Sequence, residues 1–172
     1  MALYALGDIV PRIDPDAFVH PEATIIGNVV IGSGVTVWPQ AVLRGDQSGI
    51  VIGARTSVQD GAVLHCTRHL ETIVGDDCTI GHLAHLEGCV VEDGSLVGTG
   101  SIVLHRAIVR SGALVGAGAV VPNGMEVPSG AMALGVPAQI REGAVKPDQV
   151  TFPAQEYVRN CARYRAELRR ID

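Results

Sequence analysis

Aromatic residues are scarce in this sequence: Phe, Trp and Tyr make up 3% of its 172 residues, whereas the hydrophobic class reaches 47%. Its core must therefore be built from Val, Ile, Leu and Ala. Apolar runs of about eighteen residues are also absent, because Gly and polar residues interrupt each run, and we expect no membrane span. The net charge of −5 argues against a cationic surface of the kind that binds nucleic acid.

Pairs of cysteines with metal or redox spacing are absent too. The sequence has 4 Cys, and no two of them form a Cys-x-x-Cys pair. Its amino terminus lacks the basic region and long apolar run of a secretory signal. We therefore expect a reduced, cytoplasmic protein with one domain and a core of its own.

What the sequence does contain is an aliphatic residue at every sixth position. This repeat comprises Ile25, Ile31, Val37 and Leu43, and later Val91, Val97, Val103, Val109, Val115, Val121 and Val127. Gly, Asp, Asn or Ser follows two or three positions later, and these residues favour tight turns. A short flat run, a corner and an inward aliphatic side chain, repeated along the chain, predict one side of a triangular parallel β-helix.

The repeat also predicts the organisation of the chain. Residues 1–22 contain three prolines and are expected to cap the first coil, and residues 23–138 form the β-helix. Residues 139–152 are a polar linker. Residues 153–172 carry apolar side chains at helical spacing, which predicts an amphipathic helix packed along the prism, with its arginines facing solvent.

Two irregularities interrupt the repeat. Residues 66–71 break the six-residue spacing, as a loop leaving a corner would, and the side between Leu86 and Val91 is one residue short. Such a local shortening often marks a special site. Once both are allowed for, the spacing stacks His65, Glu87 and His105 in one column on successive coils.

This column is a candidate metal site, because imidazole and carboxylate are ordinary zinc ligands and neighbouring strands lie about 4.8 Å apart. His82 occupies a different step of its coil and would meet the column only from a neighbouring subunit. We expect His85 to point inward, as a core histidine or a ligand. His20 and His69 are expected in solvent, and His105 could equally be an ordinary surface residue.

A set of motifs in fixed order then points to a family. The motifs are Arg44-Gly45-Asp46, Val58-Gln59-Asp60-Gly61, Val63-Leu64-His65, Thr79-Ile80-Gly81-His82, Gly88-Cys89 and Gly135-Val136-Pro137-Ala138. In this order they resemble the signature of the γ-class carbonic anhydrases over essentially the whole chain. The resemblance implies a left-handed β-helix, a homotrimer with metal sites between subunits, and reversible hydration of CO2 to bicarbonate.

The resemblance also implies roles for single residues. It makes His65 a ligand from one subunit and His82 a ligand from its neighbour. Gln59 would orient the reacting water, and Tyr157 would either bear on proton transfer or simply pack on the prism. The surrounding interface network would consist of Arg44, Asp46 and Asp60.

The sequence departs from the family at several of these positions. Glu87 stands where the family has its third histidine ligand, so the expected metal set is His65, His82 and Glu87, with His85 as the alternative third ligand. Gln47 replaces a proton-moving carboxylate, and Ser57 replaces an asparagine. The expected ion is Zn²⁺, with Fe²⁺ or Co²⁺ as alternatives, since the same ligands accept all three.

Two other functions remain open from the sequence. A hexapeptide-repeat acyltransferase shares the repeat and the Gly-x-Pro-Ala ending, and it would use His105 or His69 as its base. A non-catalytic metal-binding or assembly protein would keep the metal only to hold the trimer together.

Overall fold

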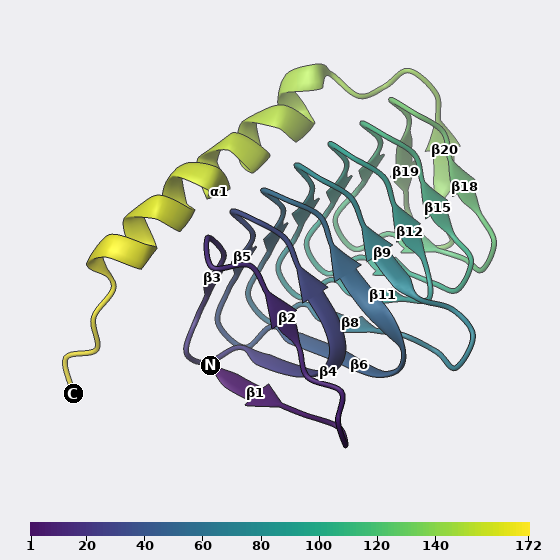
Figure 1. Cartoon of the computed structure of the whole chain (residues 1–172). Coiled ribbons are helices and arrows are strands. Elements are labelled where there is room, and N and C mark those ends of the chain that lie inside the picture. Colours follow the sequence, from purple (N-terminus) through teal and green to yellow (C-terminus); the bar gives the residue numbers. More distant parts are fainter.

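The computed structural model describes residues 1–172 and shows a parallel β-helix with one long helix beside it (Figure 1). Its coils have three sides, and each side stacks on the matching sides of the coils above and below. The predicted left-handed β-helix with a C-terminal helix is confirmed.

The strands form three faces. The first face contains β1 (Ala2–Tyr4), the first halves of β4 (Thr24–Ile31) and β6 (Val42–Ile52), β8 (Val63–His65), β11 (His85–Glu87), β14 (Ile102–Val103) and β17 (Val120–Val121). The second face contains β2 (Arg12–Ile13), the second halves of β4 and β6, β9 (Thr72–Val74), β12 (Val90–Val91), β15 (Ile108–Val109) and β18 (Glu126–Val127). The third face contains β3 (Phe18–Val19), β5 (Thr36–Val37), β7 (Ser57–Val58), β10 (Thr79–Ile80), β13 (Leu96–Val97), β16 (Leu114–Val115), β19 (Met132–Leu134) and the antiparallel β20 (Gln139–Arg141).

The core is a stack of the aliphatic residues that define the repeat. On the first face Leu43 pairs with Leu64, and Leu64 with Leu86, and all three are fully buried. Each such side chain contributes roughly 1.5–3 kcal/mol on burial. Because alternate residues of a strand point to opposite faces, the residues on either side of each core position point outward.

The coils begin earlier than the sequence analysis placed them. Arg12 and Ile13 already pair with β4, and β3 pairs with β5, so part of the expected cap is β-helix. Ile13 and Val19 precede Ile25 at the same spacing of six residues. Pro15 and Pro21 lie in turns and Pro11 directly precedes β2, so none of the three missing N–H groups interrupts a strand pair.

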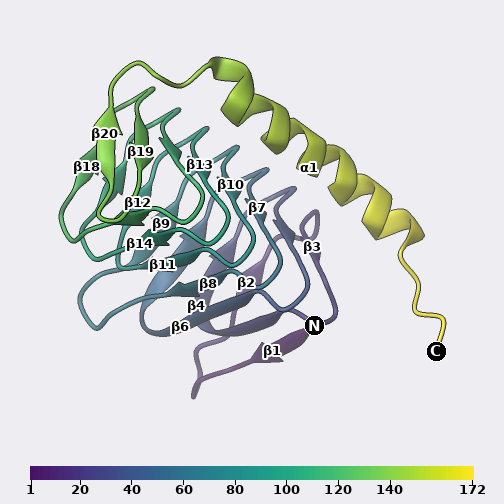
Figure 2. The ribbon, with the colours of Figure 1, turned by 180° about the vertical axis from the view of Figure 1, so that it is seen from behind.

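The helix also begins earlier than expected. Helix α1 spans Pro147–Glu167 and runs along the third face, where it contacts β3, β5 and β10 (Figures 1 and 2). Pro147 occupies its first turn, and the side chain of Gln149 accepts a hydrogen bond from the Lys146 N–H at 2.8 Å. Both Pro147 and Pro153 suit a first turn, so composition alone did not discriminate between them.

Aromatic side chains hold α1 to the prism. The ring of Trp38 meets those of Tyr164 and Tyr157 edge-on, with centroids 4.8 Å and 5.5 Å apart. The Trp38 indole N–H points to the hydroxyls of Thr36 and Ser57 at 3.0 Å and 3.1 Å, which satisfies it in a buried position. Trp38, Tyr157 and Tyr164 therefore serve the helix contact and not the prism core.

The arginines of α1 differ in their contacts. Arg159 and Arg163 pair with carboxylates of the helix itself and remain exposed, as expected. Arg165 instead donates to the backbone oxygen of Asp16 at 2.9 Å and so ties the helix to the first coil. Nowhere does α1 contain an apolar stretch of the length that crossing a membrane requires.

Candidate functional site

The candidate site is built on one column of outward residues at the end of the first face. In the strand register Arg44 pairs with His65, and His65 pairs with Glu87. The predicted stacking of His65 on Glu87 is therefore confirmed. The loop of residues 66–71 follows His65 directly, as expected, and leads into β9.

Both ring nitrogens of His65 contact carboxylates. Its Nδ1 lies 2.7 Å from Oε1 of Glu87, and its Nε2 lies 2.9 Å from Oδ1 of Asp46. The other oxygen of Asp46 binds the guanidinium of Arg44. The result is a continuous polar chain from Arg44 through Asp46 and His65 to Glu87.

These contacts lower the pKa of both carboxylates, Asp46 and Glu87. Burial alone would raise the pKa of Asp46, but hydrogen bonds to His65 and Arg44 outweigh it and lower that pKa. Burial would likewise raise the pKa of Glu87, and His65 together with the nearby imidazole of His105 lowers it. Both groups are therefore held as carboxylates, ready to accept hydrogen bonds.

His105 reaches the same carboxylate from the next coil. Its Nε2 lies 3.3 Å from Oε2 of Glu87 and is buried without an aligned hydrogen bond. The register differs from the expected one, because Leu86 pairs with Val103 and not with Leu104. The side that is one residue short leaves two residues, Leu104 and His105, opposite the single Glu87, as in a β-bulge.

The expectation that His85 points into the core was wrong. Leu86 is the buried residue of β11, so His85 and Glu87, on either side of it, both point outward. The His85 side chain is 36% exposed, and its Nε2 lies 3.7 Å from Oε2 of Glu87. Three imidazoles therefore surround one carboxylate.

The remaining predicted residues lie at the opposite corner, between the third and first faces. His82 follows β10, and its Nδ1 lies 2.9 Å from Oδ2 of Asp60, which follows β7. Gln59 is 5% exposed beside this pair. The single chain thus places His82 apart from the His65 column, and a site that joins the two still requires a second copy.

Tyr157 belongs to the aromatic cluster beneath α1. Burial raises the pKa of its hydroxyl, and the charges of Asp60 and Tyr164 raise it further. The ring packs on Trp38, so the packing interpretation of Tyr157 has direct structural support.

Thr72 organises the site and was not among the residues predicted from the sequence. The Thr72 hydroxyl donates to the backbone oxygen of His65 and accepts the Gly88 N–H at 2.8 Å. It thereby links the coils that carry His65 and Glu87. A buried Thr directly after a loop was the available signal, but Thr is too common in strands to stand out.

A metal ion is chemically compatible with these residues but not with their present contacts in one chain. No group of three or more His, Cys, Asp or Glu side chains is arranged within the chain to hold a metal. His65 uses both ring nitrogens on carboxylates. A metal ligated by His65 would have to replace Asp46 or Glu87 at one of them.

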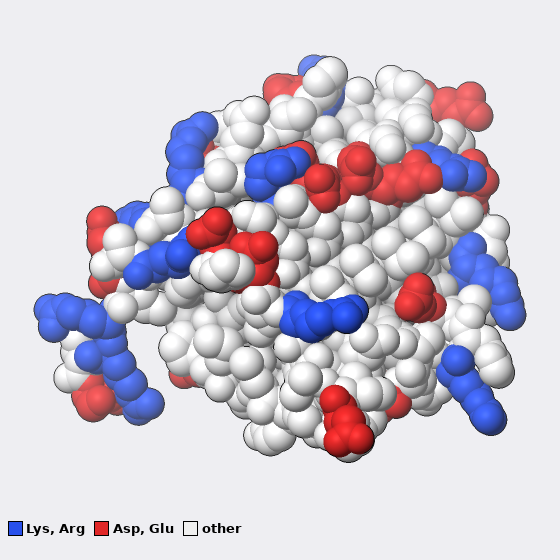
Figure 3. Space-filling view, viewed as in Figure 1, with Lys and Arg blue, Asp and Glu red and all other residues white.

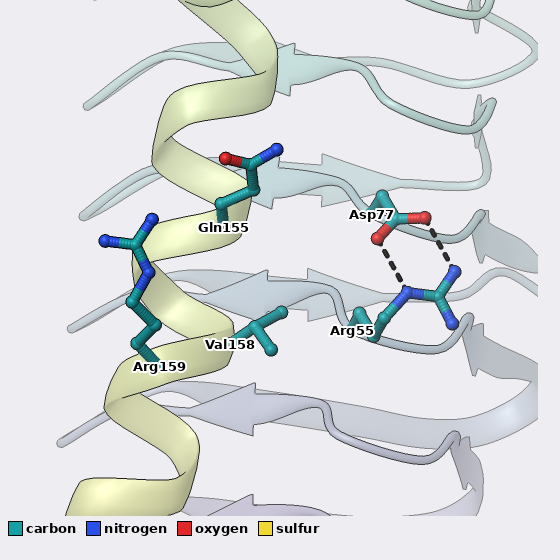
Figure 4. A pocket seen from close by; sticks show the side chains of 5 residues that line it. All are labelled: Arg55, Asp77, Gln155, Val158 and Arg159. Carbon is teal, nitrogen blue, oxygen red and sulfur yellow. Dashed lines mark hydrogen bonds and ion pairs between the residues drawn. The ribbon is translucent and has the colours of Figure 1, made fainter.

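A pocket beside α1 has fewer candidate catalytic or metal-binding side chains than the His65 column (Figure 4). Arg55 and Asp77 line it together with Gln155, Val158 and Arg159. Asp77 accepts two hydrogen bonds from Arg55, at 2.7 Å and 2.6 Å. The guanidinium is thereby already neutralised, and we assign this pair to holding the coils together.

Comparison with known proteins gives the family. A hexapeptide transferase family protein of Anaplasma phagocytophilum is 33% identical, with alignment over 95% of this chain and 98% of that one and a TM-score of 0.90. This chain belongs to the hexapeptide-repeat transferase family. The family profile described as bacterial transferase hexapeptide (six repeats) matches residues 11–45, which agrees with the early start of the coils.

Two further relatives narrow the range of functions. A Bacillus cereus protein provisionally described as an acetyltransferase is 32% identical over 96% of this chain and 97% of its own, with a TM-score of 0.93. The carnitine operon protein CaiE of Escherichia coli is 44% identical over 98 residues, and the chain spans 50% of the length of this curated relative. These descriptions favour the transferase class over the carbonic anhydrases as the broader assignment.

Proposed function

We propose that this chain catalyses acyl transfer from a thioester, with His105 as general base. The observation that supports it is the Glu87 carboxylate 3.3 Å from Nε2 of His105, on a histidine whose side chain is 35% exposed. Ionised carboxylates only accept hydrogen bonds, so Glu87 favours the tautomer with a proton on Nε2. Nδ1 then carries the lone pair that a base needs.

The transfer itself requires one proton to move twice. Nδ1 of His105 takes a proton from an amine or hydroxyl acceptor while the acceptor attacks the thioester carbonyl carbon. A C–N or C–O bond forms, the C–S bond breaks, and the leaving thiolate takes the proton back from the imidazolium. Glu87 stabilises the positive charge that His105 carries between these two events.

Thiol release from acetyl and hexanoyl coenzyme A, measured with a panel of amine and hydroxyl acceptors, tests this function. His105→Ala should lower kcat about a hundredfold or more, because a general base contributes that much. His69→Ala is the comparison, because His69, exposed in the loop of residues 66–71, is the other histidine that the sequence left open as the base. Saturable transfer that survives His105→Ala would remove His105 as the base, and transfer lost in His69→Ala would assign it to His69.

A second candidate is hydration of CO2 at a metal site between copies of the chain. The supporting observation is that the His65–Glu87 column and the His82–Asp60 pair lie at opposite corners of one chain, which suits a site that two copies complete. His65 and Glu87 of one copy and His82 of the next would hold zinc. When bound, zinc lowers the pKa of water towards about 7 and makes a nucleophile for CO2 available at neutral pH.

The other residues have roles in this second proposal as well. Asp46 would fix the ring of His65, and Asp60 would fix that of His82, as carboxylates do beside metal-bound imidazoles. The Gln59 amide would orient the reacting water. The proposal includes a cytoplasmic homotrimer with three equivalent sites.

Mixed trimers test whether the site is shared. Chains with His65→Ala and chains with His82→Ala each lack one ligand, but mixing them restores interfaces at which both ligands are intact. Zinc content, measured by elemental analysis, should recover in this mixture. Mixing His65→Ala with Glu87→Ala chains is the control, because every interface then lacks a ligand. Equal zinc in both mixtures contradicts the shared site, and zinc without CO2 hydration would leave metal binding as an assembly function.

A further inference from the structure

A groove on the second face begins beside His105. It crosses three consecutive coils and is bordered on one side by the loop of residues 66–71, through Leu70. Its floor consists of the outward residues Ile73, Val90 and Ile108, which pair with one another in the strand register. This part of the surface is largely free of charged side chains in Figure 3, where acidic residues gather in a row above it.

The length of the floor sets the size of ligand that it suits. Three neighbouring strands span about 10 Å, at roughly 4.8 Å per step. An acetyl group would cover only one of these three side chains. An apolar chain of about six carbons would cover all of them.

The groove and the candidate base meet at Gly88. A Cβ atom there would lie 3.0 Å from Cβ of Leu70 and 3.3 Å from Cδ2 of His105, so any side chain at this position would crowd both. Leu70 and His105 therefore close over Gly88 from two sides, and the groove ends against them. A ligand on the apolar floor would have His105 next to that end of the groove.

Charge at the mouth of the groove indicates what the ligand is attached to. Arg106 follows His105, is exposed and lines the groove, and its left-handed backbone, with φ of 60°, sets it out from the corner. The guanidinium of Arg55 forms an ion pair with Asp77, whereas Arg106 has no carboxylate within ion-pair distance. Arg106 suits an anionic carrier, while the exposed Glu71 at the loop end of the groove disfavours a second negative charge there.

We propose that this groove binds the acyl group of the donor thioester, and that this acyl group is apolar and longer than acetyl, on a phosphate-bearing carrier. The inference rests on the acyl transfer proposed above. To the proposed acyl transfer, this inference adds the class of acyl donor and the residues that select that donor. Ile73, Val90 and Ile108 select the chain length, and Arg106 binds the carrier.

Binding of unreactive thioethers tests the proposal without turnover. S-hexyl coenzyme A should bind about tenfold more tightly than S-ethyl coenzyme A in calorimetry, because each buried CH2 contributes up to about fourfold and the groove is open on one side. Val90→Phe should fill the groove and abolish this preference. Val30→Phe is the matched control, because Val30 occupies the same outward column three strands away.

Val90→Thr keeps the shape of the side chain and makes the floor polar, so it serves if Val90→Phe does not fold. It should reduce the preference, and Arg106→Gln should weaken both thioethers by the same factor. Equal affinity for the two thioethers in the unmodified protein, or a preference that survives both changes at Val90, would overturn the proposal. A preference for S-hexyl coenzyme A without any thiol release would support the acyl-binding groove and contradict the proposed acyl transfer. Acyl transfer without a chain-length preference would support the transfer and contradict the groove.

Discussion

Glu87 binds Nδ1 of His65 through one carboxylate oxygen at 2.7 Å and faces Nε2 of His105 through the other at 3.3 Å. A single carboxylate therefore sits between two imidazoles on two different coils. His65 has a second carboxylate, Asp46, on its remaining nitrogen, whereas His105 has none. His65 is thus held on both sides, whereas His105 contacts a carboxylate through Nε2 alone.

Replacement of Glu87 should reveal this orienting role. Glu87→Gln keeps the size of the side chain but removes the charge that stabilises the imidazolium of His105, so kcat for acyl transfer should fall by about a hundredfold with little change in KM. Glu126→Gln is the control, because Glu126 is an exposed carboxylate paired with Arg110 on the second face. A Glu87→Gln enzyme with full kcat would show that His105 needs no partner.

Acid should destabilise the site in a defined pH range. The pKa values of Asp46 and Glu87 are lowered in the folded protein from ordinary values of 3.8 and 4.5. Their contribution to stability is therefore complete above about pH 5 and is lost as the pH falls through the lower, folded-state values. Urea unfolding between pH 6 and pH 3 should show a steeper loss in the unmodified protein than in an Asp46→Asn, Glu87→Gln variant. The same pH dependence of unfolding free energy in both proteins would mean that these carboxylates do not stabilise the fold.

Two substitutions of Tyr157 separate packing from proton transfer. The ring packs on Trp38 and the hydroxyl is not required for that contact. Tyr157→Phe should therefore leave both acyl transfer and CO2 hydration unchanged. Tyr157→Ala should lower the free energy of unfolding by about 2 kcal/mol, somewhat less than for a fully buried ring, as thermal unfolding can measure. Activity lost in Tyr157→Phe at unchanged stability would instead favour a chemical role.

The proposed trimer can be tested at Leu83. This side chain is 68% exposed although it follows His82, the residue expected to enter a neighbouring copy. In a trimer Leu83→Glu would bury a charge, which is costly, so light scattering should detect monomers. Phe152→Glu is the control, because Phe152 is a similarly exposed apolar side chain, at 61%, and lies on α1 and not on the β-helix. Trimers that persist in Leu83→Glu would place the interface elsewhere.

The six-residue repeat predicted the architecture because the residues that define it form the core. Ile25, Leu43 and Val97 are buried where the spacing puts them, and His65 stacks on Glu87 in the same register as Leu64 on Leu86. The loop after His65 was predicted correctly for the same reason: a break in spacing has no place inside a coil.

Contacts at the irregular places could not be predicted in this way. The expectation for His85 was wrong because the short side made its phase ambiguous, and a shift of one residue exchanges inside for outside. The bond between Asp46 and His65 depends on the extra residues that lengthen β6 between Gly45 and Ile50 relative to β4. The spacing of the repeat indicates that such extra residues leave the regular coil, but it does not indicate which neighbouring residue they contact.

The short side between Leu86 and Val91 has a consequence for how this protein can change. It is one residue shorter than the matching side of the next coil, so both Leu104 and His105 face Glu87. Inserting one residue after Glu87 would give this side the same length as the matching side of the next coil. The inserted residue would then stand opposite His105, and the carboxylate would lose its second imidazole. Under the proposed acyl transfer, a more regular β-helix would lack the carboxylate that orients the base.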